Sequence, residues 1–231
     1  MDLRILLFCL FLKKDVQTRF SKKTNIVKKC FTLAEVLMTL TILGVVAAIT
    51  MVILLPNIQN AQNITKWIVA FSDLAQVTEM IKMNNCGTMK GICSDGDNNC
   101  MRDKYTQYMN VIKSCNTGAA AGNCWHSIVK REDGSVHNGS VNIAAIILNN
   151  GNLIQFWHAS KNCTSGGYNK KCTYILVDIN GWKGPNTLGK DIFGLYATEN
   201  STKPMGFQGD AAYYSDLSIG LGYSAKYLKE K

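Results

Sequence analysis

The sequence predicts an α+β protein in which a long N-terminal helix packs on a small antiparallel β-sheet. Three patterns carry this prediction: an uncharged apolar run of 20 residues from Val36 to Leu55, a helical spacing of apolar residues after it, and short β-type runs beyond residue 140. Of the 231 residues, 47% are hydrophobic and 18% are charged. Disordered chains have the opposite balance, so this composition excludes disorder throughout the chain.

The positive charge of the chain is concentrated at its start. The net charge is +9 overall, of which +6 falls in residues 1–30 and only +3 in the remaining 201 residues. A basic block directly before an apolar run is typical of targeting to a membrane rather than of DNA binding. Residues 1–30 are therefore interpreted as a basic leader, and nucleic acid is not an expected partner.

Residues 31–55 are predicted to form a transmembrane helix. At 1.5 Å per residue, the 20 residues from Val36 to Leu55 span about 30 Å, the thickness of a bilayer core. The basic block before them places the N-terminus in the cytoplasm and the rest of the chain outside the membrane. The alternative is that this segment is the buried core helix of a globular domain.

Glu35 is the single charged residue between Phe31 and Leu55. A carboxylate in a hydrophobic helix costs roughly 2.5–3.5 kcal/mol at the bilayer centre and less towards its edge. We therefore expect Glu35 either to have a partner of opposite charge or to lie at the depth of the lipid headgroups.

The segment from Lys28 to Leu37, KKCFTLAEVL, with the apolar run that follows, resembles the N-terminal signal of type IV prepilins and type II secretion pseudopilins. The resemblance covers about residues 28–55. It implies cleavage between Cys30 and Phe31, methylation of the new N-terminal Phe31, and an assembly role for Glu35. It also implies a pilin-like fold and four kinds of partner: a prepilin peptidase and methylase, an inner-membrane assembly machinery, other pilin-like subunits, and copies of this chain.

Physical chemistry agrees with the assembly role that the resemblance implies. Cleavage would create an α-amino cation on Phe31, and this cation on one subunit can pair with Glu35 of its neighbour. Because an unpaired charge is strongly penalised in an apolar setting, the pair would select one axial stagger of the helices. Gly44 and Ala48 add a face of small residues for close helix approach.

The sequence departs from the prepilin pattern at two positions. The family usually has a glycine where this chain has Cys30, and it often has a proline where this chain has Val52.

Residues 56–85 are predicted to continue the helix as an amphipathic segment. Apolar residues recur there at three- and four-residue steps, namely Ile64, Trp67, Ile68, Phe71, Leu74, Ala75 and Ile81. The stripe ends at Asn84–Gly87, a plausible helix stop. The alternative is two helices broken at Pro56, because proline removes a helical hydrogen bond.

Residues 86–231 are predicted to form a globular, cysteine-rich head with antiparallel strands. A short helix is expected around Met101–Ile112 and a last helical turn at Ala225–Lys229. Strands are expected at Val141–Leu148, Asn152–Ala159, Thr173–Asp178 and Ile192–Ala197, with Asn150–Gly151 as a type I′ hairpin turn between the first two.

The loop after the third expected strand is a weak candidate for Ca²⁺ binding. It contains Asp178, Asn180, Asn186 and Asp191 among glycines and a proline. Such residues are turn formers, which is the simpler interpretation. The alternative is that their oxygens bind Ca²⁺, which takes six to eight oxygen ligands, as in comparable loops of some pseudopilins.

Seven cysteines remain once the leader, with Cys9 and Cys30, is removed. An exported head would lie in an oxidising space, where disulfides persist. Cys115 with Cys124 and Cys163 with Cys172 are spaced to close small loops. Two of Cys86, Cys93 and Cys100 can also pair, which leaves one thiol free or intermolecular. The alternative is that all cysteines are reduced.

The sequence therefore predicts a structural subunit of a type IV pilus-like or type II secretion fibre rather than an enzyme, with no catalytic residues. The expected location is a single-pass membrane protein with a cytoplasmic N-terminus and an extracytoplasmic head, which joins a fibre or the cell surface after assembly. Two alternatives remain: a minor pilin that binds DNA or surfaces, and a signal-anchored extracytoplasmic enzyme.

Overall fold

The computed structural model describes residues 32–137, 142–165 and 170–229. The chain divides into two compact units, Met1–Met51 and Val52–Lys231, and the second is called the globular unit below. The expected leader (1–30) and the expected cleavage position at Cys30 and Phe31 lie outside the described residues. The described chain is α+β, with an N-terminal apolar helix and a six-stranded antiparallel sheet, so the α+β prediction is confirmed.

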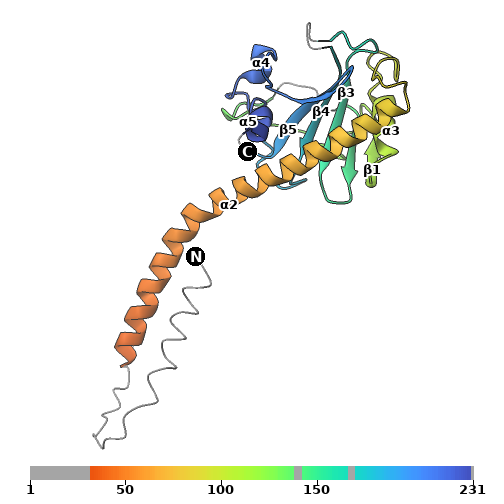
Figure 1. Ribbon diagram of the computed structural model, residues 1–231. Helices are drawn as coiled ribbons and strands as arrows, with labels where there is room; N and C mark the ends of the chain where they lie inside the picture. Colours follow the sequence, from red (N-terminus) through yellow and green to blue (C-terminus); the bar gives the residue numbers. More distant parts are fainter. Residues whose placement is uncertain (1–31, 138–141, 166–169, 230–231) are drawn as a thin grey trace, which may run out of the picture. The chain divides into compact units, whose positions relative to one another are not determined.

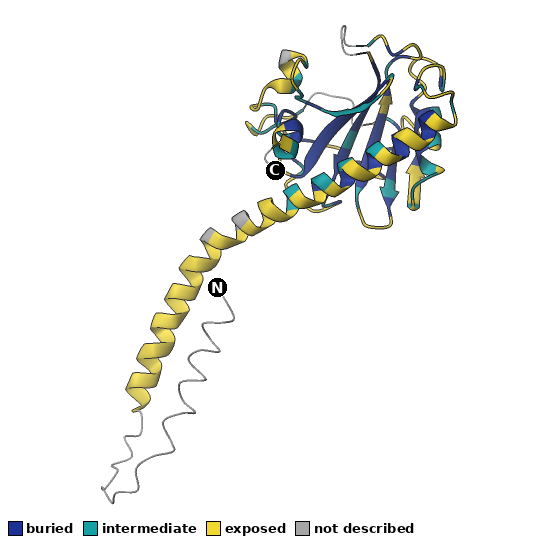
Figure 2. Cartoon of the chain, in the orientation of Figure 1, coloured by how far each residue is buried: buried dark blue, intermediate teal, exposed yellow. Residues whose placement is uncertain are grey.

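The first described element is a single helix of 51 residues, α2, from Leu33 to Met83. The alternative of two helices broken at Pro56 is therefore wrong. Every described residue of α2 up to Met51 is exposed, whereas beyond Ile64 a stripe of buried residues appears (Figure 2). The helix ends where Cys86 and Gly87 adopt positive φ angles of 52° and 81°, a left-handed termination that stops α-helical hydrogen bonding.

The sheet is an antiparallel meander in which each strand pairs with the next along the chain (Figure 1). Its strands are β1 (Val111–Cys115), β2 (Ala145–Leu148), β3 (Leu153–His158), β4 (Lys171–Asp178), β5 (Ile192–Thr198) and β6 (Thr202–Pro204). The four expected strands correspond to β2–β5, although β2 begins at Ala145 and the expected start at Val141 lies outside the described residues. The two edge strands, β1 and β6, were not expected, because both are short and carry polar residues.

The turn between β2 and β3 differs from the expected type I′ turn. Such a turn needs positive φ at both central residues, but only Gly151, with φ 87°, has it, and Asn150 does not. The Gly151 N–H donates to the Leu148 carbonyl over 2.9 Å, so a three-residue loop with a left-handed glycine joins the strands. The prediction of a hairpin was right and its turn type was wrong.

Three further helices accompany the sheet: α3 (Asn98–Thr106), α4 (Ala212–Ser215) and α5 (Tyr223–Lys229). The Asp97 side chain caps α3 by accepting a hydrogen bond from the Cys100 N–H over 2.9 Å. This helix ends before the expected Ile112, because Val111–Cys115 pairs with β2 instead.

The sheet has a buried core on each face. On one face, Ile154, Phe156, Ile175 and Val177 pack with Trp67, Leu74 and Val77 of α2. On the other face, Leu153, Tyr174 and Tyr196 pack with residues of the loop after β1 and of the segment after β6, including Trp125, Met205 and Leu221. The alternation of side chains along β3 and β4 thus separates the face that packs on α2 from a second face, which irregular segments cover.

A buried ion pair holds the segment after β6 to the second face. The Lys171 Nζ lies 2.6 Å from Asp210 Oδ1, and both side chains are fully buried. Tyr196 donates its hydroxyl hydrogen to Asp210 Oδ2 over 2.9 Å, and the Lys171 ammonium lies 3.9 Å from the Tyr196 ring centroid. Burial raises the pKa of Tyr196, and the nearby Asp210 carboxylate raises it further, so the phenol stays a hydrogen donor.

We predict that Asp210→Asn destabilises the globular unit by about 3–5 kcal/mol, because it leaves the Lys171 ammonium buried without its counter-charge. Urea unfolding followed by tryptophan fluorescence would measure this loss. Asp73→Asn, which changes an exposed carboxylate on α2, is the matched control and should have little effect. Equal stability of the two variants would contradict a structural role for the ion pair.

Candidate functional site: the apolar helix and the globular unit

The start of α2 is closed by a reciprocal pair of hydrogen bonds between Thr32 and Glu35. The Glu35 N–H donates to Thr32 Oγ1 over 3.2 Å, and Glu35 Oε2 accepts from the Thr32 N–H over 2.9 Å. This arrangement is a capping box, which satisfies N–H groups that a helix start leaves unpaired. The carboxylate of Glu35 remains exposed while it makes these bonds.

The surface of α2 from Leu33 to Val52 is apolar and exposed. This stretch of 20 residues is long and apolar enough to cross a membrane, and none of it is buried. Its three threonines, Thr39, Thr41 and Thr50, donate their hydroxyls to carbonyls of the same helix over 2.9 Å. The segment therefore presents almost no unpaired polar group to an apolar environment.

Gly44 leaves an open position on this surface. A methyl group added there would meet no atom within 4 Å. The neighbouring side chains thus leave room for another helix to approach the backbone at Gly44.

Three disulfides brace the globular unit: Cys93–Cys100, Cys115–Cys124 and Cys163–Cys172. The last two are the pairs expected from their spacing. Cys93–Cys100 completes the set and leaves Cys86 as an exposed free thiol. Each disulfide closes a loop of fewer than ten residues, so each constrains the unfolded chain by the smaller amount typical of short loops.

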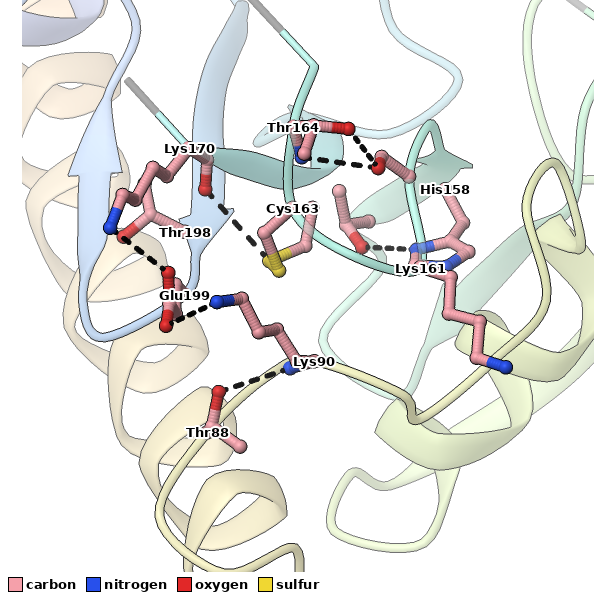
Figure 3. Close-up of a disulfide and its surroundings, with 12 residues drawn as sticks. Thr88, Lys90, His158, Lys161, Cys163, Thr164, Lys170, Thr198 and Glu199 are labelled. Atoms are coloured by element: carbon pink, nitrogen blue, oxygen red, sulfur yellow. Dashed lines mark hydrogen bonds and ion pairs between the residues drawn. A yellow bond between two sulfur atoms is a disulfide. The ribbon is translucent and has the colours of Figure 1, made fainter. Parts of the chain in front are cut away.

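Polar contacts join three segments around the Cys163–Cys172 disulfide (Figure 3). Glu199, directly after β5, lies 2.7 Å from the Lys90 ammonium and 3.5 Å from the Lys170 ammonium. The hydrogen bond from Lys90 lowers the pKa of Glu199, and Lys170 adds to this effect. These contacts tie the loop after α2 to the end of the sheet at which the disulfide lies.

His158 is a fully buried residue at the end of β3, in the same region (Figure 3). Its Nε2 lies 3.3 Å from the Cys93 carbonyl oxygen, and its Nδ1 lies 3.0 Å from Thr173 Oγ1. Because a carbonyl only accepts, Nε2 carries the proton and Nδ1 accepts from the Thr173 hydroxyl. Burial lowers the pKa of His158 below its ordinary value of 6.5, although the charges of Asp95 and Asp97 partly oppose the change.

The structure brings the four candidate Ca²⁺ ligands into one hydrogen-bonded loop. Asp178 accepts from the N–H groups of Asn180 and Gly181 and from His126 Nε2, over 2.8–2.9 Å. Asp191 accepts from the N–H groups of Asn186 and Thr187 over 2.8 and 2.6 Å, and from Asn180 Nδ2 over 3.2 Å. Burial raises the pKa of both carboxyl groups, and these donors partly offset the rise.

The carboxylates of this loop are engaged in hydrogen bonds and do not form an open calcium site. Their oxygens already accept hydrogen bonds, and the Asn180 amide donates towards Asp191, at a point where a cation would need oxygen atoms. No group of three or more His, Cys, Asp or Glu side chains among the described residues is placed to hold a metal ion. The hydrogen bonds account for Asp178 and Asp191 as elements of loop structure. The buried Oδ1 atoms of Asn180 and Asn186, by contrast, have no partner among the described residues.

Sequence reasoning did not find the contacts of Thr32, Lys171, Asp210 or Gln155. The capping box could have been read from Thr32 and Glu35, because the S/T-x-x-E pattern is a known helix start. The other three depend on pairing between segments far apart in the chain.

Comparison of the chain with known protein families, characterised sequences and solved structures finds no match.

We predict that stability falls when the pH is lowered from 7 to 5.5, in part through His158. The unfolded histidine binds a proton near pH 6.5 while the folded one resists it, so this contribution to stability is lost as the pH drops below 6.5. Urea midpoints at the two pH values would measure the fall. His158→Gln should show a smaller fall than the unchanged protein, and an identical fall in both would contradict the assignment.

Proposed function

We propose that this protein is a structural subunit of a type IV pilin-like fibre, of the pilus or type II secretion kind, and not an enzyme. The observation that carries the proposal is the sequence around the start of α2. A basic leader and Cys30–Phe31 stand before an apolar helix that carries Glu35 in its first turn and whose described residues are exposed up to Met51. The α+β globular unit with its three disulfides is of the kind expected for an exported head.

The apolar helix would supply the energy of assembly. In the membrane, lipid covers the exposed surface of α2, and in a fibre the helices of neighbouring subunits would cover it instead. Association of helices within lipid depends on close packing and polar contacts rather than on the hydrophobic effect. The open surface at Gly44 favours such close packing.

Glu35 would select the stagger between subunits. In the single chain its carboxylate accepts hydrogen bonds from the N–H and the hydroxyl of Thr32, and both of these donors are neutral. The α-amine of a processed Phe31 on a neighbouring subunit would offer a charged donor in its place. A cationic donor adds Coulomb attraction to the hydrogen bond with the carboxylate, and this attraction is strong in an apolar setting, so the exchange favours the neighbour.

We predict that the mature protein begins at an N-methylated Phe31. Mass spectrometry of the protein from cells that contain a prepilin peptidase would show the loss of residues 1–30 and the added methyl group. An intact leader in such cells would contradict the proposed processing, and with it the role of the Phe31 amine.

We also predict that Glu35→Gln leaves cleavage intact and lowers fibre yield by about tenfold or more, which corresponds to a loss of at least about 1.4 kcal/mol per contact. Quantitative immunoblots of sheared fibres would measure this yield. Thr32→Val is the matched control, because it removes capping hydrogen bonds and keeps the carboxylate. If Thr32→Val lowered the yield as much as Glu35→Gln, Glu35 would act through the helix cap and not through a neighbouring subunit.

A further inference from the structure

The second face of the sheet contains a cavity of about 300 Å³ that the proposed function does not use. Its lining includes Gln155 and Leu176, which are cross-strand partners on β3 and β4, and Trp157 and Tyr174, the next pair on the same face. Tyr213 and Tyr214, from the segment after β6, complete the aromatic part of the lining. The volume matches the lower end of the range of small-molecule sites.

The walls of this cavity are suited to a flat ring. The Trp157 and Tyr174 rings lie 4.6 Å apart, and Tyr174 and Tyr214 lie 5.9 Å apart. Trp157 and Tyr213 are 45% and 41% exposed, unusually open for such large apolar side chains within a packed unit. Aromatic rings in offset or edge-on contact gain energy beyond that of the area they bury, so another ring would be held here.

Two buried polar atoms of the cavity lining, Gln155 Nε2 and His137 Nδ1, lack a hydrogen-bond partner among the described residues. Gln155 is only 2% exposed, and its buried Nε2 has no hydrogen-bond partner in the described part of the chain. A buried donor left unpaired costs about 1–3 kcal/mol, and native structures contain few of them. An acceptor atom on a bound molecule would remove this cost.

The cavity is also uncharged. Among the described residues that line it, none is Asp, Glu, Lys or Arg. Its one histidine, His137, has its pKa lowered by burial, so it is neutral at pH 7. A charged ligand would lose its hydration without gaining a counter-charge, which disfavours anions and cations alike.

From these observations we propose that the cavity is a binding site for a small, neutral, planar aromatic molecule that carries one hydrogen-bond acceptor. Its ring lies among Trp157, Tyr174 and Tyr214, and its acceptor receives a hydrogen bond from the Gln155 amide. This site lies in the globular unit and does not depend on whether the chain assembles into a fibre.

Fluorine NMR of the full chain in detergent, labelled with 5-fluorotryptophan, would test the site. The chain has four tryptophans, so the signal of Trp157 can be assigned by substitution and followed separately. Acetanilide, a neutral ring with one carbonyl acceptor, should shift the Trp157 signal saturably. The signal of Trp182, which is equally exposed but lies outside the cavity lining, should not move and serves as the internal control.

Two variants separate this proposal from non-specific binding. Gln155→Met keeps the side-chain shape and should weaken acetanilide binding roughly fivefold, the effect of one hydrogen bond, while ethylbenzene, which has no acceptor, should bind both proteins equally. The same variant should raise the thermal midpoint, because it removes an unpaired buried donor. Tyr213→Ala, at an exposed position, should weaken both probes.

Four results would overturn the proposal. Equal, non-saturating shifts at Trp157 and Trp182 would show partition into the detergent only. Unchanged acetanilide affinity in Gln155→Met would remove the role of the amide. Tighter binding of benzoate or of methyl glucoside than of acetanilide would reject the ligand class. A Trp157 shift that depends on protein concentration without any probe would assign the cavity to a second copy of this chain.

Discussion

The exposed apolar surface of α2 between Leu33 and Val52 is the constraint on which the proposed function depends. Twelve large apolar side chains are exposed along this stretch. Each gains about 1.5–3 kcal/mol when removed from water, so the surface as a whole represents on the order of 20 kcal/mol. That amount exceeds the stability of a typical domain, and in the proposed function lipid or neighbouring helices cover this surface.

Apolar burial and the Glu35 carboxylate have different roles in the proposed assembly of the fibre. Burial is large and non-directional, so it holds helices in an apolar phase without choosing their relative positions. A carboxylate costs only roughly 2.5–3.5 kcal/mol at most in such a phase, but that cost depends on where its partner lies. In the proposed fibre Glu35 would therefore select a register, and in the described chain its carboxylate accepts a hydrogen bond from the Thr32 N–H.

The globular unit satisfies several of its buried polar groups through other segments, whereas the buried amide nitrogen of Gln155 has no such partner among the described residues. The Asp210 carboxylate pairs with the Lys171 ammonium and accepts a hydrogen bond from the Tyr196 hydroxyl. The Asp178 carboxylate accepts hydrogen bonds from His126 and from two backbone N–H groups. The buried Nε2 of Gln155 has no acceptor among the described residues. This contrast, on a face lined by aromatic rings, distinguishes a cavity suited to a ligand from ordinary core packing.

The sequence by itself determined the elements whose signals are local. The length of α2, the stripe that includes Trp67 and Leu74, the four central strands and two disulfide pairs follow from periodicity and short spacing, which adjacent residues specify directly. Only the tertiary structure decided the edge strands, the turn type at Gly151, the pairing of Lys171 with Asp210 and the cavity around Gln155. Apart from the turn, which depends on the local backbone angles, each of these depends on contacts between distant segments, whose energies outweigh the small preferences of single residues.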